Sequence, residues 1–174
     1  MPYDALTDIH IEAAPQADAA AIQSLVGEVF REYGLALDVC GVDAHLREPA
    51  EYFGSRGGIF WTARCGKELV GCVGVIPVED VACELKSLYV RRTHRRLGLG
   101  RRLVSQVLDE AVRRGLHRVL LWSDTRFDDA HRLYRGFGFI QEGLRDLHDA
   151  YNSKEYGFHL ALGEGLKEPR AAHE

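Results

Sequence analysis

The stretch from Val81 to Trp122 constrains the fold more than any other part of the chain. Val81 to Val90 has the pattern of a strand, and the apolar residues after it recur at helical spacing until Gly115 supplies a left-handed stop. Arg118 to Trp122 is a nearly continuous apolar run, typical of a strand buried on both faces. Strand, helix and strand in this order make a right-handed crossover, so we expect the two strands to lie parallel in one sheet.

The remaining segments surround this crossover. Alternation predicts strands at Asp8–Ala13, Ile59–Cys65, Leu69–Ile76, Phe139–Leu144 and Glu155–Leu162. Helical spacing predicts helices at 16–34, 43–53 and 128–135, and a turn is expected at Pro77–Asp80. In the crossover helix, we expect one apolar stripe made of Leu99, Leu103, Val104, Val107, Leu108, Ala111 and Val112.

These elements predict one domain of the α/β (α+β) class over residues 1–174, with a folded core at 8–162 and a polar tail at 163–174. A mixed, twisted sheet of about six to seven strands with about four helices accounts for them. With 46% hydrophobic and 28% charged residues, the chain can bury a core and cover it, which argues against a disordered segment.

Charge and targeting signals narrow the classes of partner. The net charge is −4, yet the segment from Leu85 to Arg102 holds seven basic residues and no acidic one. So compact a basic patch favours a small polyanion over nucleic acid. No secretory signal or membrane-length apolar run is present, so we expect a cytoplasmic protein without a membrane partner. The four cysteines lack CxxC spacing and the histidines lack HExxH spacing, so no metal site is expected.

The basic patch contains a glycine-rich loop that opens the crossover helix. Gly98 and Gly100 allow a ligand to come close to the backbone, and the helix directs its free N–H groups to the same place, which makes an anion site. The loop is not a Walker loop and lacks the full GxGxxG of dinucleotide-binding proteins.

Three segments resemble one known family. RRLGLG at Arg95–Gly100 matches the Q/R-x-x-G-x-G/A signature of the GCN5-related N-acetyltransferases (GNAT family). AHRLYRGFGF at Ala130–Phe139 resembles their A-x-x-L-Y-x-x-x-G-F segment, and CELKSLYV at Cys83–Val90 is similar to the strand before the signature. The resemblance is strongest over Val81–Phe139, and the order of elements agrees from about residue 8 to 162.

This resemblance implies that acetyl-CoA binds with its pyrophosphate on the loop amides and its pantetheine arm between two splayed parallel strands. The positions that would bind the cofactor are Leu88, Tyr89, Val90, Arg95, Arg96, Leu97, Gly98, Leu99, Gly100, Arg101 and Phe127. The backbone of Leu88 and Val90 would hold the pantetheine amides. Phe127 departs from the family pattern, because many members have asparagine there, and Gly136 is a milder departure.

The implied activity is transfer of an acetyl group to a primary amine of a small molecule or peptide, by direct attack in a ternary complex. Glu84 would be the base, directly or through water, and Tyr134 the acid that protonates the departing thiolate. Glu84 could instead be a carboxylate paired with Lys86, and Tyr134 a packed helix tyrosine. Cys83, with His131 nearby, would allow a ping-pong route through an acyl-cysteine.

The acceptor amine is expected to bind to the more variable parts of the chain. We expect Tyr33, Asp38 and Trp61 to contact it together with Glu84, and carboxylates there would suit a cationic amine. Other candidates for the pocket are Asp43, Asp146, Asn152 and Glu155.

Two other functions are left open. A non-catalytic acyl-CoA sensor would keep the same fold, and a nucleic-acid-binding module would use the arginine run and show a steep salt dependence. The sequence also leaves open a homodimer.

Overall fold

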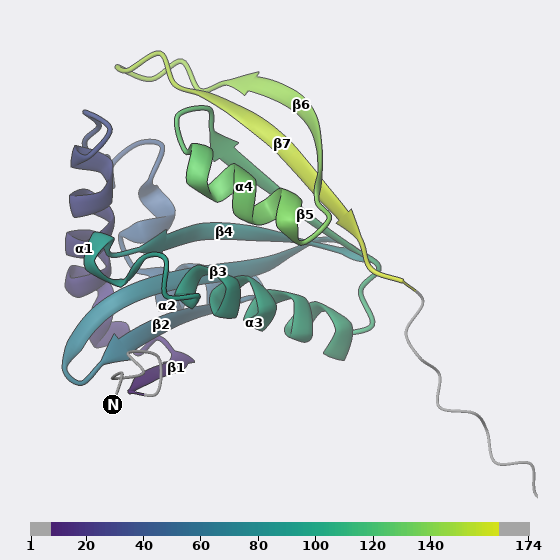
Figure 1. Ribbon diagram of the computed structural model, residues 1–174, viewed down its shortest axis with the longest axis horizontal. Helices are drawn as coiled ribbons and strands as arrows, with labels where there is room; N and C mark the ends of the chain where they lie inside the picture. The colour runs from purple at the N-terminus through teal and green to yellow at the C-terminus, as the bar shows by residue number, and fades with distance from the viewer. Residues whose placement is uncertain (1–7, 164–174) are drawn as a thin grey trace, which may run out of the picture.

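Seven strands form one mixed sheet within residues 8–163, the part of the chain that the computed structural model describes (Figure 1). The strands lie in the order β1-β2-β3-β4-β5-β7-β6, and only β4 and β5 are parallel neighbours. Their bounds are Ile9–Ala13 (β1), Ile59–Cys65 (β2), Glu68–Glu79 (β3), Ala82–Val90 (β4), Arg118–Asp124 (β5), Ile140–Asp146 (β6) and Lys154–Ala161 (β7). The predicted class and parallel pair are confirmed, and all of the predicted tail except Gly163 lies outside the described residues.

Helices cover both faces of this sheet. They are α1 (Ala19–Arg31), α2 (Pro49–Gly54), α3 (Leu99–Arg113) and α4 (Asp128–Gly136), with 3-10 turns at Gln16–Asp18, Ala44–Leu46 and Arg92–His94. One buried cluster joins α3 and α4 to the sheet, and a second joins α1 and α2 to it. We call these two sides the α3 face and the α1 face. Within residues 8–163, no helix is long and apolar enough to cross a membrane.

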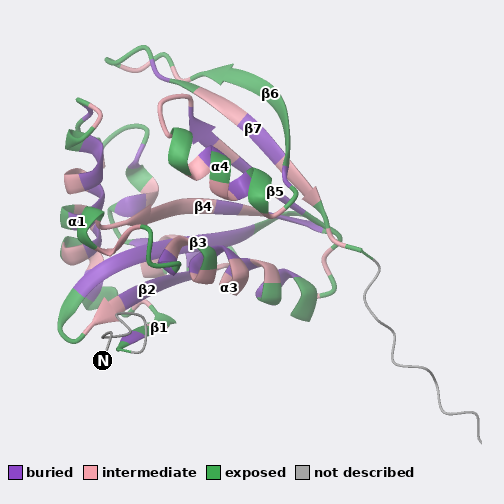
Figure 2. Cartoon of the chain, viewed as in Figure 1, coloured by how far each residue is buried: buried purple, intermediate pink, exposed green. Residues whose placement is uncertain are grey.

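The crossover helix α3 buries most of the predicted stripe. Leu99, Leu103 and Val107 are almost fully buried against the sheet, and Gly115 ends the segment with φ 70°. Buried and exposed stretches alternate along α3 (Figure 2). Val112 was assigned to the same stripe, which is wrong, because Val112 is 58% exposed. The buried arc is narrower than the sequence pattern predicted, and Val112 falls on its solvent side.

Strand β3 is longer than predicted, and the expected turn at Pro77–Asp80 is wrong. β3 continues to Glu79, and Pro77 lies opposite Cys83 of β4. The pairing of β3 with β2 has already ended at Val75, so one edge of β3 has no strand partner at Pro77. Proline is tolerated at such an edge because its missing N–H leaves no bond of the sheet unmade.

The parallel strands β4 and β5 pair over only three positions, from Ala82 opposite Arg118 to Glu84 opposite Leu120. Beyond Glu84, β4 stays on β3 while β5 stays on β7, and the two strands diverge (Figure 1). The edge of β4 that faces β5 therefore has no strand partner from residue 85 onward. We call this opening the splay.

A bulge interrupts β4 inside the splay. Leu85 and Leu88 both belong to the α3 face, although an odd spacing in a regular strand would place them on opposite faces. The register with β3 shifts at this point, and Ser87 has φ 57°, a left-handed value that is uncommon for residues other than glycine. The bulge therefore resets which side chains of β4 reach the α1 face.

We predict that Gly74→Ala destabilises the protein by about 1–3 kcal/mol, because the added methyl group would overlap the fully buried ring of Phe53. Gly27→Ala in α1 is the matched control, since an added Cβ there has no atom within 4 Å. The control should gain up to about 1 kcal/mol from helix propensity. Urea unfolding of both variants measures the difference, and equal midpoints would contradict this packing.

Candidate active site

Two cavities meet at the splay. The first, of about 390 Å³, runs between β4, the glycine-rich loop and α4, and we call it the loop groove. The second, of about 470 Å³, lies between the segment after α1, β4, the end of β5 and the segment joining β6 to β7, and we call it the acidic cavity. Tyr89 and Phe127 line both cavities, so the two cavities share a border at these residues.

The glycine-rich loop is held in place by its first arginine. Arg95 donates from Nε to the carbonyl oxygen of Val90 at 2.9 Å and forms a two-bonded ion pair with Glu32 of the α1 face at 2.7 and 2.9 Å. Gly98 has φ 88°, and Arg96 has φ 63°, so the backbone turns twice in the left-handed region before α3 begins. This turn brings the first N–H groups of α3 to the loop groove.

Most of the predicted cofactor positions line the loop groove. They are Leu88, Tyr89, Val90, Arg95, Arg96, Gly98, Gly100, Arg101 and Phe127. Leu97 and Leu99 are not among its lining residues: Leu97 is 37% exposed, whereas Leu99, the first residue of α3, is buried in the cluster on the α3 face. Arg96 forms an ion pair with Asp129 at 3.0 Å on the exposed side of the groove.

Phe127 is the centre of an aromatic cluster at the junction of the two cavities. Its ring lies 4.8 Å from Tyr33, 6.4 Å from Phe30 and 6.5 Å from Tyr89, measured between ring centroids. At the position where the resemblance implies an asparagine, this chain thus has an apolar ring that ties α4 to α1. Tyr33 belongs to this cluster and lines the loop groove, so the structure does not bring it to the acidic cavity.

The acidic cavity has more carboxylates than cations. It is lined by Asp38, Asp43, Glu84, Asp124, Asp149 and Glu155, against Lys86 and Arg145. Three of the carboxylates are already paired: Glu84 with Lys86 at 3.1 Å, Glu155 with Arg145 at 2.6 Å and Asp124 with Arg126 at 2.6 Å. The lining therefore carries an excess of negative charge, which favours a cationic ligand.

The pKa of Asp43 reflects the crowding of carboxylates in the acidic cavity. Burial raises the pKa of its carboxyl, and the carboxylates of Asp38, Glu155 and Asp149 raise it further, although a hydrogen bond from the Asp38 N–H opposes them. Asp38 and Asp43 follow α1, whereas Asp149 and Glu155 belong to the segment after β6 and to β7. A bound cation would relieve their mutual repulsion.

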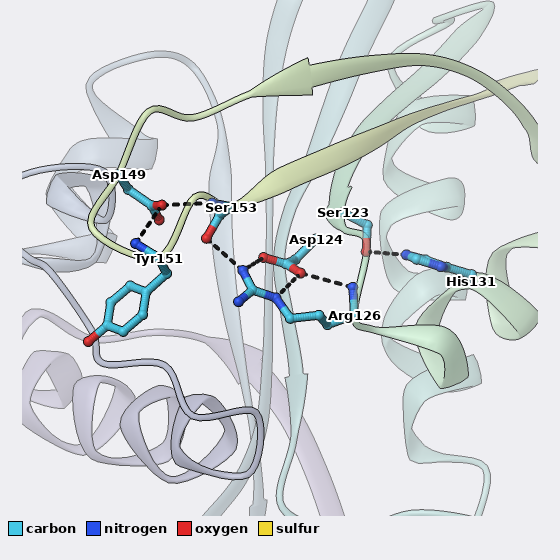
Figure 3. A network of polar contacts seen from close by, with 7 residues as sticks. All are labelled: Ser123, Asp124, Arg126, His131, Asp149, Tyr151 and Ser153. Carbon is cyan, nitrogen blue, oxygen red and sulfur yellow. Dashed lines mark hydrogen bonds and ion pairs between the residues drawn. The ribbon is translucent and has the colours of Figure 1, made fainter.

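A chain of hydrogen bonds fixes the segment between β6 and β7, which lines the acidic cavity, to the end of β5 (Figure 3). Arg126 holds Asp124 through both oxygens at 2.7 and 2.6 Å and donates to Ser153 Oγ at 2.6 Å. Asp149 accepts N–H bonds from Ser153 at 2.8 Å and Tyr151 at 3.0 Å. Although burial opposes it, these bonds lower the pKa of Asp149 and keep its carboxylate charged at neutral pH.

Besides Tyr33, three of the residues expected in the acceptor pocket lie elsewhere. Trp61 is 6% exposed within the cluster on the α3 face, because alternation along β2 turns it away from Phe60 on the α1 face. Asp146 and Asn152 are not among the residues that line the acidic cavity. Asp38, Asp43, Glu84 and Glu155 do line it, as expected.

Tyr134 lies on α4, buried among aromatic rings. It is 4% exposed, and its ring lies 5.8 Å from Phe139 and 5.6 Å from Phe158. Its hydroxyl makes no hydrogen bond within residues 8–163, and burial raises its pKa, so it stays protonated at neutral pH. Tyr134 is not a lining residue of either cavity, but it is close enough to Tyr89 to contribute to the raised pKa of that phenol, whose main cause is burial.

The structure does not bring Cys83 and His131 together. Burial raises the pKa of Cys83 to about 11, and its charged neighbours are Arg114 and Glu110 near the end of α3. Instead, Nε2 of His131 lies 3.1 Å from Ser123 Oγ (Figure 3). A thiol kept neutral and apart from this histidine offers no activated nucleophile. Within residues 8–163, no group of three metal-binding side chains is present either.

Comparisons with known proteins agree with this geometry. The model of the acetyltransferase (GNAT) family matches residues 24–139. An uncharacterised N-acetyltransferase of Schizosaccharomyces pombe is 35% identical over 124 residues, which is 70% of this chain and 76% of that protein.

Solved structures show the same fold. An acetyltransferase of the GNAT family from Staphylococcus aureus superposes with a TM-score of 0.78 at 18% identity, covering 88% of this chain and 98% of that one. A putative acetyltransferase from Salmonella typhimurium, solved with its cofactor acetyl-CoA, gives 0.70 at 22% identity over 95% and 99% of the two chains.

The match to the family extends beyond the glycine-rich signature, but the chain does not cover the full length of every relative. The chain covers about half the length of two other relatives, human N-acetyltransferase 8 (43%) and an uncharacterised N-acetyltransferase of Bacillus subtilis (54%). The family model nevertheless covers the crossover, the glycine-rich loop and α4, which together form the loop groove. The chain therefore belongs to the GNAT family of acetyltransferases.

Proposed function

We propose that the protein is an acetyl-CoA-dependent N-acetyltransferase that transfers the acetyl group to a primary amine of a small molecule or peptide. The amine attacks the thioester directly in a ternary complex. The observation that carries this proposal is the meeting of the loop groove and the acidic cavity at Tyr89 and Phe127, because two substrates bound there would adjoin at one point.

The loop groove suits acetyl-CoA on its own geometry. The glycine-rich loop and the N-terminus of α3 offer N–H groups to a pyrophosphate, with Arg96 and Arg101 beside them. The unpaired edge of β4 beyond Glu84 leaves backbone groups of Leu88 and Val90 for amide groups of a pantetheine arm, although the Val90 carbonyl oxygen also accepts from Arg95 Nε. The Salmonella relative, which has the same fold, was solved with acetyl-CoA.

The acidic cavity suits the acceptor. An amine reaches the site mostly as an ammonium ion, since a lysine-like amine has a pKa of about 10.4. The excess of carboxylates attracts this cation, and Asp38 and Asp149 line the cavity from two different segments. The amine must become neutral before it can attack a thioester.

Glu84 and Tyr134 are the residues to which we assign proton transfer. Glu84 lines the acidic cavity at the point where β4 leaves β5, and its carboxylate would take the first proton of the ammonium. Tyr134 would give its proton to the departing thiolate. The ion pair between Glu84 and Lys86 orients the carboxylate, and substrate ammonium would compete with Lys86 for it.

A non-catalytic acyl-CoA sensor is the alternative function. An acceptor cavity with excess carboxylate has no purpose in a sensor that binds only acyl-CoA, which favours the enzyme. The cytoplasmic location and the homodimer remain predictions. The test of function is release of CoA thiol with a panel of amines, amino acids and peptides: amine-dependent release supports the transferase, and CoA binding without release supports the sensor.

We predict that Gly100→Ala weakens CoA binding about tenfold, or about 1.4 kcal/mol. An added Cβ at Gly100 would lie 3.2 Å from Leu133 Cδ2 and would push that side chain into the loop groove. Gly136→Ala is the control, because its Cβ would meet nothing closer than Arg101 Nη2 at 3.9 Å. Titration calorimetry with CoA measures both, and equal dissociation constants would argue against this position of the pyrophosphate.

We predict that Glu84→Gln lowers kcat mainly at pH values below the pKa of the acceptor amine, because at higher pH the amine is already neutral and needs no base. Glu142→Gln, on the exposed strand β6, should leave the profile unchanged. The pH dependence of kcat distinguishes them. A Glu84→Gln profile with the shape of the wild type would remove Glu84 from the role of base.

We predict that Tyr134→Phe lowers kcat roughly 10- to 1000-fold with little change in the affinity for CoA. The substitution breaks no hydrogen bond among residues 8–163 and keeps the buried ring, so the melting temperature should stay the same. Tyr156→Phe on β7 is the control. Near-normal kcat for Tyr134→Phe would mean that the thiolate takes its proton from water.

A further inference from the structure

A serine and a histidine far apart in the sequence meet in the acidic cavity. The Nε2 atom of His45 lies 2.8 Å from Ser87 Oγ, and both side chains line the cavity. Ser87 belongs to the bulge of β4, between Glu84 and Tyr89. Ser87 is therefore two residues from Tyr89, which lines both the acidic cavity and the loop groove.

The bulge holds the serine in an uncommon conformation. Its φ of 57° costs free energy for any residue other than glycine, asparagine or aspartate, and such residues cluster at functional sites. The thiol of Cys72 on the neighbouring strand β3 donates to the Ser87 carbonyl oxygen at 3.4 Å, which helps to fix the backbone of the bulge. Glycine would adopt this left-handed conformation at lower cost. The backbone conformation therefore gives no reason for a serine at this position, and the side-chain hydroxyl needs a separate explanation.

The histidine is held just as firmly. It follows α1 in a 3-10 turn that Gln23 fixes by donating to the Leu46 and Arg47 carbonyl oxygens, each at 3.0 Å. Its ring packs against Tyr52 at 5.8 Å and Phe53 at 6.4 Å, measured between centroids. Burial, followed by repulsion from Lys86, lowers its pKa to about 4, so the ring is neutral at pH 7. One ring nitrogen can then accept a hydrogen bond from Ser87, and an imidazolium formed there would give up its proton quickly.

We propose that Ser87 and His45 form a proton relay that takes the second proton from the acceptor amine once it has attacked the thioester. Ser87 is then a catalytic residue, and His45 is a positioning residue that acts through it. The inference rests on the proposed function and deepens it. It also explains why one carboxylate does not suffice: an ammonium ion must lose two protons to become an amide, and Glu84 accounts for only the first.

The relay acts after the amine attacks the carbonyl carbon of the thioester. The nitrogen lone pair forms the bond to the carbonyl carbon, the carbonyl π pair moves to oxygen, and the nitrogen becomes positively charged. Ser87 Oγ accepts a proton from this nitrogen as its own hydroxyl proton passes to Nε2 of His45. The carbonyl re-forms, the C–S bond breaks, and the sulfur leaves with the electron pair. The imidazolium then releases its proton to solvent in the open cavity.

The chain contains a matched pair for comparison. Ser123 Oγ and His131 Nε2 lie 3.1 Å apart (Figure 3), but both residues are buried and neither lines the loop groove or the acidic cavity. A serine–histidine contact that only stabilises the fold should behave like this one. Ser123→Ala is therefore the control for loss of a hydroxyl from such a pair.

The test compares kcat and KM for wild type, Ser87→Gly, His45→Gln, their double variant and Ser123→Ala, with saturating acetyl-CoA and an acceptor found by thiol release. Ser87→Gly removes the hydroxyl and relieves the left-handed strain, so its melting temperature should stay the same or rise. We expect each relay variant to lose about 10- to 100-fold in kcat with KM for acetyl-CoA within about twofold.

The double variant distinguishes a relay from two separate structural effects. Because both residues serve one path, the double variant should be no slower than the slower single variant. Losses that multiply would overturn the relay, and so would a Ser87→Gly variant with near-normal kcat. If the wild type releases no thiol with any amine, the proposed function fails instead, so the two failures are distinguishable.

Two measurements on the wild type need no acceptor. Nitrogen-15 NMR at pH 7 should show Nε2 of His45 as the unprotonated nitrogen, because the relay requires Ser87 to donate to it; a proton on Nε2 would overturn the proposal. Intact mass after incubation with acetyl-CoA alone should show no acetyl group on Ser87. An acetylated Ser87 would make it a nucleophile and would equally overturn the relay.

Discussion

The parting of β4 from β5 after Glu84 is the constraint on which the site depends. Three positions of parallel pairing hold the two halves of the sheet together, and beyond them each strand keeps only its outer neighbour. The exposed edge of β4 is polar backbone that a substrate can satisfy, and the space beside it becomes two cavities with a common border. Without the splay, the glycine-rich loop could bind an anion, but no space beside β4 would be left for the rest of the cofactor.

The chain divides its charge between the two sides of the splay. Arginines gather at the loop groove, where Arg95 is anchored on Glu32 and Val90, and carboxylates gather at the acidic cavity. An anionic cofactor and a cationic acceptor would each be drawn to its own side. The aromatic cluster around Phe127 separates the two charge regions and places an apolar surface where the reacting groups would meet.

The sequence was sufficient for the fold because its strongest signals are local. The helical stripe of α3, the stops at Gly34 and Gly115 and the apolar run of β5 each depend on neighbours within a few residues. The turn predicted at Pro77 was wrong because a strand tolerates proline where its neighbouring strand has ended. Where β2 ends beside β3 is a property of the assembled sheet. Trp61 was misplaced because alternation along β2 puts Trp61 and Phe60 on opposite faces of the sheet without indicating which face adjoins the acceptor pocket.

The acceptor side was harder to predict for the same reason. His45 and Ser87 lie 42 residues apart, and the link from Asp124 through Arg126 and Ser153 to Asp149 crosses from one strand to a distant connecting segment. Neither arrangement has a spacing that a motif could describe. The bulge at Ser87 is equally hidden, because nothing in the pattern of β4 marks a left-handed serine.

The central claim is that both substrates occupy the splay together and react directly. Initial velocities measured with acetyl-CoA and the acceptor amine both varied test this most directly. The account predicts double-reciprocal lines that intersect, because each substrate must be bound before the acetyl group moves. Parallel lines would show that CoA leaves before the amine reacts, and would contradict direct transfer across the border of the two cavities.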